Sequence, residues 1–325
     1  MQYYFAPMEG ITGYLYRNLH RRFFPGVDKY FMPFFSPGKE HVFPKRAKKD
    51  LLLEHNQGLR VVPQLLTRRA EDFMWAASAL AELGYEEVNL NLGCPSGTVV
   101  AKGKGAGFLA DPAELDRFLE TVFTKPPLPI SVKTRLGLRD PAEFGPLMEI
   151  FNRYPLSELI LHPRVRTDLY RRPVRPEIFD GCYQTSSSPV CYNGDLITQA
   201  GCAAFERDHP DVTALMLGRG LVANPALVIQ CKGGPAADKG TLFAFLNELY
   251  RGYAAAFGSR RNAMLRMKEI WFYLIHLFEG GEKFSKRIRR EMDPDRYEST
   301  VRELFQYLPL RTDAAGGWLP EGKEG

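Results

Sequence analysis

The cysteine at position 94 is the side chain of this sequence with the clearest chemical potential. It lies in Asn91-Leu92-Gly93-Cys94-Pro95, directly after the alternating run Glu87-Val88-Asn89-Leu90. Proline after the thiol fixes one backbone angle, and glycine before it permits a tight bend. The segment therefore predicts a thiol presented on a sharp turn at the end of a strand. Most free cysteines are small buried hydrophobic residues, so buried filler stays open as an alternative to a reactive thiol.

Polar side chains also stand at the ends of almost all the other strand-like runs. Any one of them has an ordinary explanation, because strand ends meet water. Together they predict a site, because a barrel enzyme collects its catalytic residues from the carboxyl ends of several strands on one face. These residues are Glu9, Gln64, Asn89, Asn91, Lys133, Arg135, His162, Arg164, Asn193, Asp195 and Arg219.

Eight short β-rich runs, separated by helical or irregular stretches, must position these side chains. The alternation is typical of βα units around a parallel sheet, and eight units favour an α/β fold, the (β/α)8 TIM barrel. A doubly wound sheet usually carries Gly-x-Gly-x-x-Gly after its first strand, whereas the first run here ends in Pro7-Met8-Glu9. The expected strands are residues 3–8, 29–34, 59–66, 87–92, 129–135, 158–163, 189–193 and 214–218, with helices at 70–83, 112–123 and 141–153.

The pattern changes at about residue 235. Gly233-Gly234-Pro235 makes a break, and the apolar residues that follow have helical spacing only. Apolar stripes mark helices over residues 242–253, 264–278 and 297–308. We therefore expect a catalytic barrel domain over residues 1–232, a C-terminal all-helical domain over 236–312 and a flexible tail over 313–325.

Composition excludes several classes of protein. Of 325 residues, 25% are charged and 45% hydrophobic, which is ordinary for a globular chain. No apolar stretch approaches the roughly 18 residues that span a bilayer, and the N-terminus lacks the pattern of a signal peptide. The five cysteines are odd in number and form no Cys-x-x-Cys, so they indicate neither a disulfide framework nor a metal site. We expect a cytoplasmic protein with reduced thiols and no obligatory protein partner.

Two glycine-containing loops predict a phosphate site. Asn193-Gly194-Asp195 ends the seventh run and Gly218-Arg219-Gly220 ends the eighth, where barrels most often bind phosphate. Backbone N–H groups approach an anion closely at glycine, and Arg219 adds charge; two tight turns are the plainer alternative. Lys133 would face negative charge on the pyrimidine edge of a flavin, and Gln64 would offer an amide to its ring.

The glycine-rich loop over residues 96–107 lacks the Walker spacing, so no P-loop is predicted. A mobile loop would bring Lys102 and Lys104 to a substrate and close Cys94 over it. A flexible surface loop without a role is the alternative.

Taken together, these motifs resemble the tRNA-dihydrouridine synthase family, flavin enzymes that reduce uridines in transfer RNA. The match covers most of the barrel in the family's order: Ala6-Pro7-Met8-Glu9, Val62-Pro63-Gln64-Leu65, Asn91-Leu92-Gly93-Cys94-Pro95, Val132-Lys133-Thr134-Arg135, His162, Asn193-Gly194-Asp195 and Gly218-Arg219-Gly220. The resemblance implies FMN as cofactor, NADPH as reductant and tRNA as partner. The expected FMN contacts are Pro7, Met8, Glu9, Gln64, Lys133, His162, Asn193, Gly194, Asp195, Gly218 and Arg219.

The same resemblance implies that Asn91 holds the uracil and that Cys94 is the general acid. Reduced flavin would deliver hydride to C6, and Cys94 would protonate C5. Such a donor should remain a thiol until hydride arrives, so it needs no depressed pKa. Further substrate contacts are expected at Lys102, Arg135 and Arg164.

A base embedded in tRNA must leave its stack, at a cost of roughly a few kcal/mol, and contacts to the RNA backbone must offset that cost. A net charge of +5 is compatible with such a polyanionic partner without requiring one. A solvated face is the alternative for each basic run. The candidates are Lys45, Arg46, Lys48, Lys49, Arg164, Arg166, Arg171, Arg172, Lys283, Lys286, Arg287, Arg289 and Arg290.

Two stretches depart from the family pattern. Where the family commonly has His-x-Arg-Thr and then Tyr-x-Gly, this chain has His162-Pro163-Arg164-Val165-Arg166 and then Tyr170-Arg171-Arg172, and residues 35–51 are unusually basic. These departures concern the rim and the choice of RNA site, not the flavin. Two other functions stay open: a flavin oxidoreductase acting on a free pyrimidine or enone, and a non-catalytic RNA-binding barrel.

Overall fold

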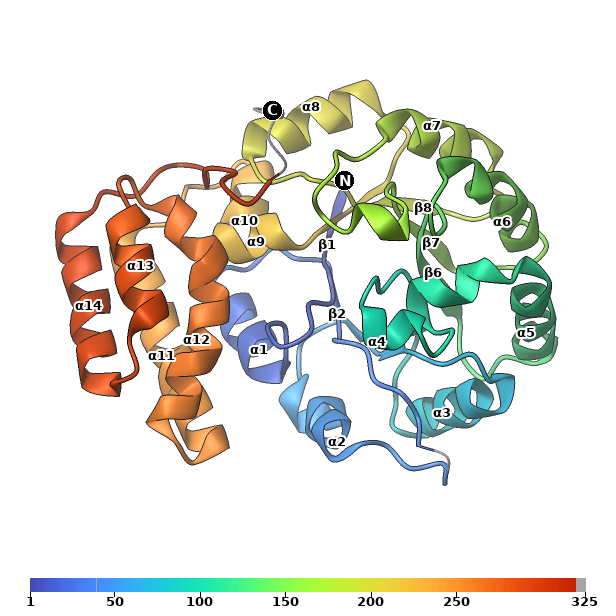
Figure 1. Cartoon of the computed structure of the whole chain (residues 1–325), viewed down its shortest axis with the longest axis horizontal. Coiled ribbons are helices and arrows are strands. Elements are labelled where there is room, and N and C mark those ends of the chain that lie inside the picture. The colour runs from blue at the N-terminus through green and yellow to red at the C-terminus, as the bar shows by residue number, and fades with distance from the viewer. Residues whose placement is uncertain (39, 320–325) are drawn as a thin grey trace.

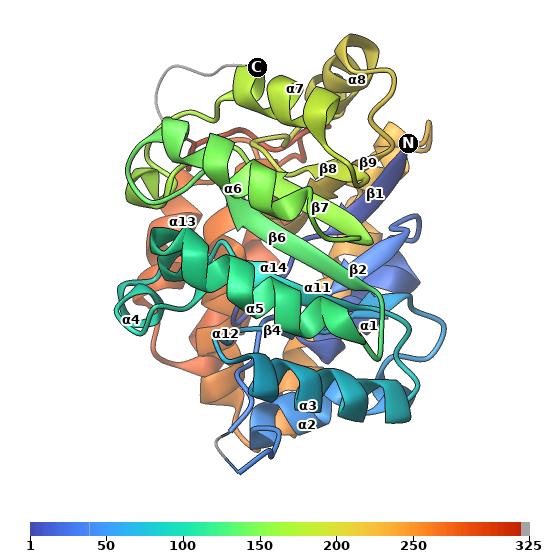
Figure 2. The ribbon, with the colours of Figure 1, turned by 90° about the vertical axis from the view of Figure 1, so that its right-hand side faces the viewer.

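A parallel β-barrel forms the centre of the molecule (Figures 1 and 2), in a computed structural model that describes residues 1–38 and 40–319. The strands follow one another in the order β3-β2-β1-β9-β8-β7-β6-β5-β4, and every paired neighbour is parallel. They are β1 (Gln2–Phe5), β2 (Lys29–Phe31), β3 (Val61–Val62), β4 (Gln64–Leu65), β5 (Val88–Leu92), β6 (Ile130–Arg135), β7 (Glu158–His162), β8 (Val190–Tyr192) and β9 (Ala214–Leu217). The predicted TIM barrel is confirmed.

Pro63 explains why nine strands occupy eight barrel positions. It separates β3 from β4 within the single run predicted over residues 59–66, because proline has no N–H to give to the ladder. The two halves still close the sheet: β3 pairs with β2, and β4 pairs with β5. The Pro63 carbonyl accepts a hydrogen bond of 2.9 Å from the backbone N–H of Asn89.

Helices cover the outside of the barrel (Figure 1). The predicted helix over 112–123 is α5, where Asp111 caps the N-terminus by accepting from Glu114 N at 2.9 Å, and Pro112 takes the first turn. The predicted segment 141–153 is a 3-10 turn, η3 (Pro141–Glu143), that leads into α6. The outer helices are α1 (Tyr14–Phe23), α2 (Lys45–Leu51), α3 (Ala70–Glu82), α5 (Pro112–Thr124), α6 (Phe144–Phe151), α7 (Pro176–Thr185), α8 (Gln199–Asp208), α9 (Arg219–Ala223) and α10 (Leu227–Cys231), whereas α4 (Gly97–Val100) belongs to the loop between β5 and α5.

The C-terminal region is helical, as predicted, and stands beside α1 and α9 at one side of the barrel (Figure 1). It contains α11 (Lys239–Phe257), α12 (Arg260–Leu274), the 3-10 turn η5 (Ile275–Leu277), α13 (Glu282–Arg290) and α14 (Pro294–Tyr307). Helix α13 was not among the expected helices, because only Ile288 of its residues is buried and it therefore carries no apolar stripe. One hydrophobic core runs from the barrel into these helices.

The expected tail has packed side chains in its described part. The backbone N–H of Ala315 donates to the His276 carbonyl at 2.9 Å, and the Trp318 ring packs edge-on against Tyr273 and His276. Residues 320–325 of the expected tail lie outside the described residues. The proposed domain borders at 232, 236 and 312 stay a prediction.

Candidate active site

A cavity of about 260 Å³ opens where the carboxyl ends of the strands meet. The parallel register explains the gathering of polar groups, because it sets Asn91 beside Lys133 and Arg135 beside His162 on neighbouring strands. Ten residues singled out in the sequence line the cavity: Pro7, Met8, Glu9, Gln64, Asn91, Cys94, Lys133, Arg135, His162 and Asn193.

The half-buried Cys94 lies in the wall of this cavity. Its turn is held by Asn91, whose Oδ1 accepts from the backbone N–H groups of Gly93 at 3.1 Å and Cys94 at 2.9 Å. Burial raises the pKa of the Cys94 thiol above its ordinary value. The sulfur is therefore protonated at neutral pH and available as a proton donor.

Lys133 comes from β6 and points into the same cavity. Burial lowers the pKa of its amine to about 7, and the nearby guanidinium of Arg135 contributes to the lowering. Among the described residues no carboxylate lies within ion-pair distance of Lys133 Nζ. A cation in a cavity wall without a partner is costly, so this position suits an electron-rich ligand.

His162 lies at the end of β7 and is held in one tautomer. Its Nδ1 lies 2.5 Å from the Asn193 carbonyl oxygen, so Nδ1 carries the proton and donates it. Burial lowers the pKa of His162 well below its ordinary value, with Arg135 and Lys133 adding to the effect. The ring is therefore neutral, and its Nε2 accepts from Arg164 NH1 at 3.4 Å.

The expected phosphate loops pack beside the cavity. Asp195 lies between two guanidinium groups, and its side chain is 6% exposed: its carboxylate pairs with both nitrogens of Arg164, and Arg219 NH2 lies 2.6 Å from Oδ1. A Cβ at Gly194 would meet the Tyr192 hydroxyl oxygen at 2.0 Å, so only glycine fits there. Gly194, Asp195, Gly218 and Arg219 do not belong to the cavity wall itself.

Three residues expected to bind substrate are engaged elsewhere or lie at a distance. Arg164 is fully buried against Asp195. The Arg135 guanidinium reaches the cavity, but it donates to the backbone carbonyls of Gly93 at 2.9 Å and Leu169 at 3.0 Å. Lys102 is exposed on the turn after α4 and does not line the cavity.

The loop that carries Lys102 is ordered against the cysteine turn. It forms α4 and a 3-10 turn, η2 (Gly105–Ala110), and the backbone N–H of Ala106 donates to the Cys94 carbonyl at 3.1 Å. Gly105 has a φ of +55°, and a Cβ there would lie 2.9 Å from that carbonyl oxygen. Glycine is therefore required where the loop meets Cys94.

Comparison with known proteins decides the family. The family described as "Dihydrouridine synthase (Dus)" matches residues 4–306. The chain belongs to the dihydrouridine synthase family. It is 26% identical over 312 residues to a "Probable tRNA-dihydrouridine synthase" of Rhodobacter capsulatus, covering 92% of this chain and 93% of that protein. It is 29% identical over 310 residues to the "tRNA-dihydrouridine(16) synthase" of Pseudomonas putida, covering 90% and 94%.

Solved structures are similar in fold. Morphinone reductase in complex with tetrahydroNAD has a TM-score of 0.51 at 12% identity, over 74% of this chain and 89% of that one. Histamine dehydrogenase from Rhizobium has a TM-score of 0.54 at 11% identity, over 71% and 45%. As a dihydrouridine synthase the chain is an oxidoreductase, which decides against the non-catalytic alternative.

The residues of this dihydrouridine synthase fit a flavin. The cavity wall offers an unpaired cation at Lys133 and a donor from Gln64 or Asn91, which suit the carbonyl and ring nitrogen edge of such a ring. His162 adds a neutral ring to the wall. The Pro7-Met8 backbone and the Cys94 turn form other parts of the wall.

Sequence reasoning missed three aromatic residues of the wall, Phe34, Tyr170 and Tyr273. The Tyr170 ring lies between two guanidinium groups, 5.1 Å from Arg135 and 4.7 Å from Arg219. Tyr273 arrives from α12, so the helical region contributes to the site. Tyr273 falls outside the apolar stripe of its helix, and this position was the one feature of the sequence that could have indicated a role in the site.

Membrane-spanning helices and metal-binding clusters are both absent from the described residues. No helix in that part of the chain is both long and apolar enough to cross a membrane. No group of three or more His, Cys, Asp or Glu residues is arranged there to hold a metal ion.

Proposed function

We propose that this protein reduces uridines of tRNA to 5,6-dihydrouridine, with FMN as cofactor and NADPH as reductant. The observation that carries the proposal is the cavity wall in which the Cys94 thiol, Asn91 and the unpaired Lys133 face one space at the strand ends. Family membership supports the reaction, and the names of the curated relatives support tRNA as substrate. We also propose that the protein acts in the cytoplasm, where such a substrate is available.

When bound and reduced, FMN supplies the hydride that C6 of the uracil accepts. Lys133 would hold the pyrimidine edge of the flavin, where an ammonium would stabilise negative charge. Gln64, His162 and Asn193 provide further polar contacts to the cofactor. The loops with Gly194, Asp195, Gly218 and Arg219 are proposed to hold its phosphate, with Arg219 as the cation.

Cys94 donates the proton that C5 requires. The raised pKa of its thiol keeps that proton in place until the uracil carries negative charge. Asn91 holds both the turn of Cys94 and the base, because its Oδ1 accepts from the turn and only one of its two N–H groups is needed for the bond to Gln64.

The base must be extracted from the RNA, and exposed basic residues supply the compensating backbone contacts. The outer face of α13 carries Lys283, Lys286, Arg289 and Arg290, all exposed, while Arg287 pairs with Glu303. Helix α2 carries Lys45, Arg46, Lys48 and Lys49, also exposed. Lys102 on its exposed turn is a further candidate for contact with RNA.

The test is direct because no protein partner is proposed to be required. Purified protein, FMN and NADPH are incubated with an unmodified tRNA transcript, and the digested nucleosides are analysed by mass spectrometry. We expect uridine to gain two hydrogens, and free uridine to remain unchanged. Reduction of a free pyrimidine or enone without any change in tRNA would favour the small-molecule alternative instead.

A further inference from the structure

A chain of buried side chains crosses the barrel from its N-terminal end to the active-site cavity. Ser131 Oγ donates to Glu87 Oε1 at 2.7 Å, and Asn89 Nδ2 donates to Ser131 Oγ at 2.9 Å. Gln64 Nε2 then donates to Asn89 Oδ1 at 2.7 Å, and Asn91 Nδ2 donates to Gln64 Oε1 at 2.8 Å. All five residues are buried.

The two ends of this chain differ in chemistry. At the active-site end, Asn91 Oδ1 accepts from the backbone N–H groups of Gly93 and Cys94, which can only donate. At the far end, Glu87 Oε2 lies 3.0 Å from Lys29 Nζ, and a carboxylate paired with a cation only accepts. Every hydrogen bond between the two ends therefore runs in one direction.

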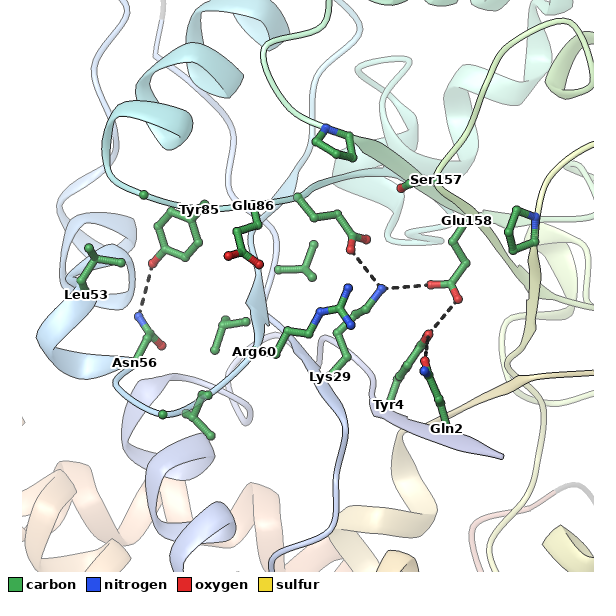
Figure 3. A pocket seen from close by; sticks show the side chains of 18 of the residues that line it. Gln2, Tyr4, Lys29, Leu53, Asn56, Arg60, Tyr85, Glu86, Ser157 and Glu158 are labelled. Atoms are coloured by element: carbon green, nitrogen blue, oxygen red, sulfur yellow. Dashed lines mark hydrogen bonds and ion pairs between the residues drawn. The ribbon is translucent and has the colours of Figure 1, made fainter.

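Figure 3 shows the far end, where Lys29 lies among acidic and hydroxyl side chains. Lys29 Nζ also lies 3.4 Å from Glu158 Oε2, and Glu158 Oε1 accepts from the Tyr4 hydroxyl at 2.9 Å. Glu158 thus shares the cation with Glu87 and is similarly buried. Unlike Glu87, it makes no hydrogen bond to Ser131 or to the amides beyond it.

The direction of the chain decides which atom each amide presents. Reversing any one of Asn89, Gln64 and Asn91 would set donor against donor and acceptor against acceptor, which leaves buried groups unsatisfied. Asn91 must therefore turn its oxygen to the Cys94 turn and its nitrogen toward Gln64. The remaining N–H of Asn91 is then a donor, which suits a carbonyl oxygen of a pyrimidine.

We propose that Glu87 is a positioning residue for the reaction, which acts through Ser131, Asn89 and Gln64 to fix the orientation of Asn91 and the turn of Cys94. Its importance for turnover rests on the proposed function, whereas its effect on the turn does not. The neutral amide of a glutamine at position 87 would accept or donate, so only the backbone N–H groups of Gly93 and Cys94 would still fix the direction of the chain, and Asn91 would be held less firmly.

The test compares Glu87→Gln with Glu158→Gln. Each variant leaves Lys29 one carboxylate, so both should lose similar thermal stability. We expect Glu87→Gln alone to speed hydrogen exchange at the amides of Gly93 and Cys94, and to slow single-turnover uridine reduction about tenfold or more. Flavin content and the rate of flavin reduction by NADPH should match the wild type in Glu158→Gln, and the turnover of Glu87→Gln is compared per bound flavin, because Gln64 of the chain also lines the cofactor cavity.

Ser131→Ala breaks the same chain without touching the ion pair, and it should reproduce both effects if Glu87→Gln does not fold. Ser131→Thr keeps the hydroxyl and should restore them. Equal exchange and equal turnover in the Glu87 and Glu158 variants would overturn the inference. A wild type that forms no dihydrouridine, with exchange that still responds only to Glu87→Gln and Ser131→Ala, would refute the proposed function and leave the chain standing.

Discussion

At the scale of single residues, the protonated thiol of Cys94 is the group whose removal should be most informative. Cys94→Ala should keep its flavin and its affinity for RNA, because no other contact in the wall depends on the sulfur. Uridine reduction should fall by about 10²- to 10⁴-fold, the usual contribution of a general acid. Mass spectrometry of the tRNA product, with the flavin absorbance recorded in parallel, measures both.

The pH dependence of the wild type should show the same thiol. Because burial raises the pKa of Cys94, the proton is present through neutral pH and is lost only as the pH rises above the ordinary thiol range. The rate of uridine reduction should therefore stay level near neutrality and fall at alkaline pH. Cys231→Ala, at a half-buried thiol in α10 outside the cavity, is the matched control and should keep full activity.

Lys133 allows a prediction about proton uptake. With a pKa of about 7, its amine is mostly neutral in the free protein at mildly alkaline pH. A flavin edge rich in electrons favours the ammonium form, so FMN binding at about pH 8 should take up a proton. Calorimetry in buffers of different ionisation enthalpy measures that proton, and Lys133→Met should bind FMN more weakly without taking it up. Equal uptake in both proteins would contradict this role.

At the scale of elements, the strands and helices were predicted from the local content and spacing of apolar residues. Each of the eight strand runs is rich in apolar residues, and helices α3 and α5 have continuous apolar stripes, so local composition and spacing were enough to place them. Helix α13 lacks such a stripe because Ile288 is its one buried residue. Its helical state depends on packing against α12 and α14, which no local pattern records.

The exposed face of α13 should contribute to RNA binding through charge alone. Arg289→Glu together with Arg290→Glu should weaken tRNA affinity and lower the slope of log affinity against log salt by about two, since each phosphate contact adds about 0.9. Arg117→Glu with Lys125→Glu makes the same change of net charge in and beside α5, across the barrel from the helical region (Figure 1). That control should bind as the wild type does, and equal weakening by both pairs would indicate a general effect of net charge.

At the scale of the whole molecule, the active site was predictable wherever one strand supplies both the residue and its direction. Asn91 and Lys133 belong to this group, since the register of β5 and β6 places them side by side near the carboxyl ends of the strands. Arg164 does not, because its direction depends on the ion pair with Asp195 across two loops. Tyr273 was missed for a similar reason: it reaches the cavity through the packing of α12 against α9.

The packing of the helical region against the barrel also affects how the chain unfolds. Phe245 of α11 lies against Tyr16 and Phe24 at ring distances of 5.6 and 5.4 Å, and the shared core continues without a border between barrel and helices. Regions that share buried aromatic contacts stabilise each other, so we expect one cooperative transition despite two structural regions. Variants that keep only Trp75 in α3 or only Trp271 in α12 report on the barrel and on the helical region respectively.

The two reporters should give the same midpoint in urea. Phe245→Ala should lower both midpoints together, with a loss of about 3–5 kcal/mol in the free energy of unfolding. The reason is that the cavity left by the ring removes packing from α1 of the barrel as well as from α11 of the helical region. Phe257→Ala removes a side chain of the same type from the exposed end of α11 and should change the midpoints far less. Separate midpoints for Trp75 and Trp271 would show instead that the barrel and the helical region fold independently. The contacts of Phe245 with α1 would then add little to the stability of either region.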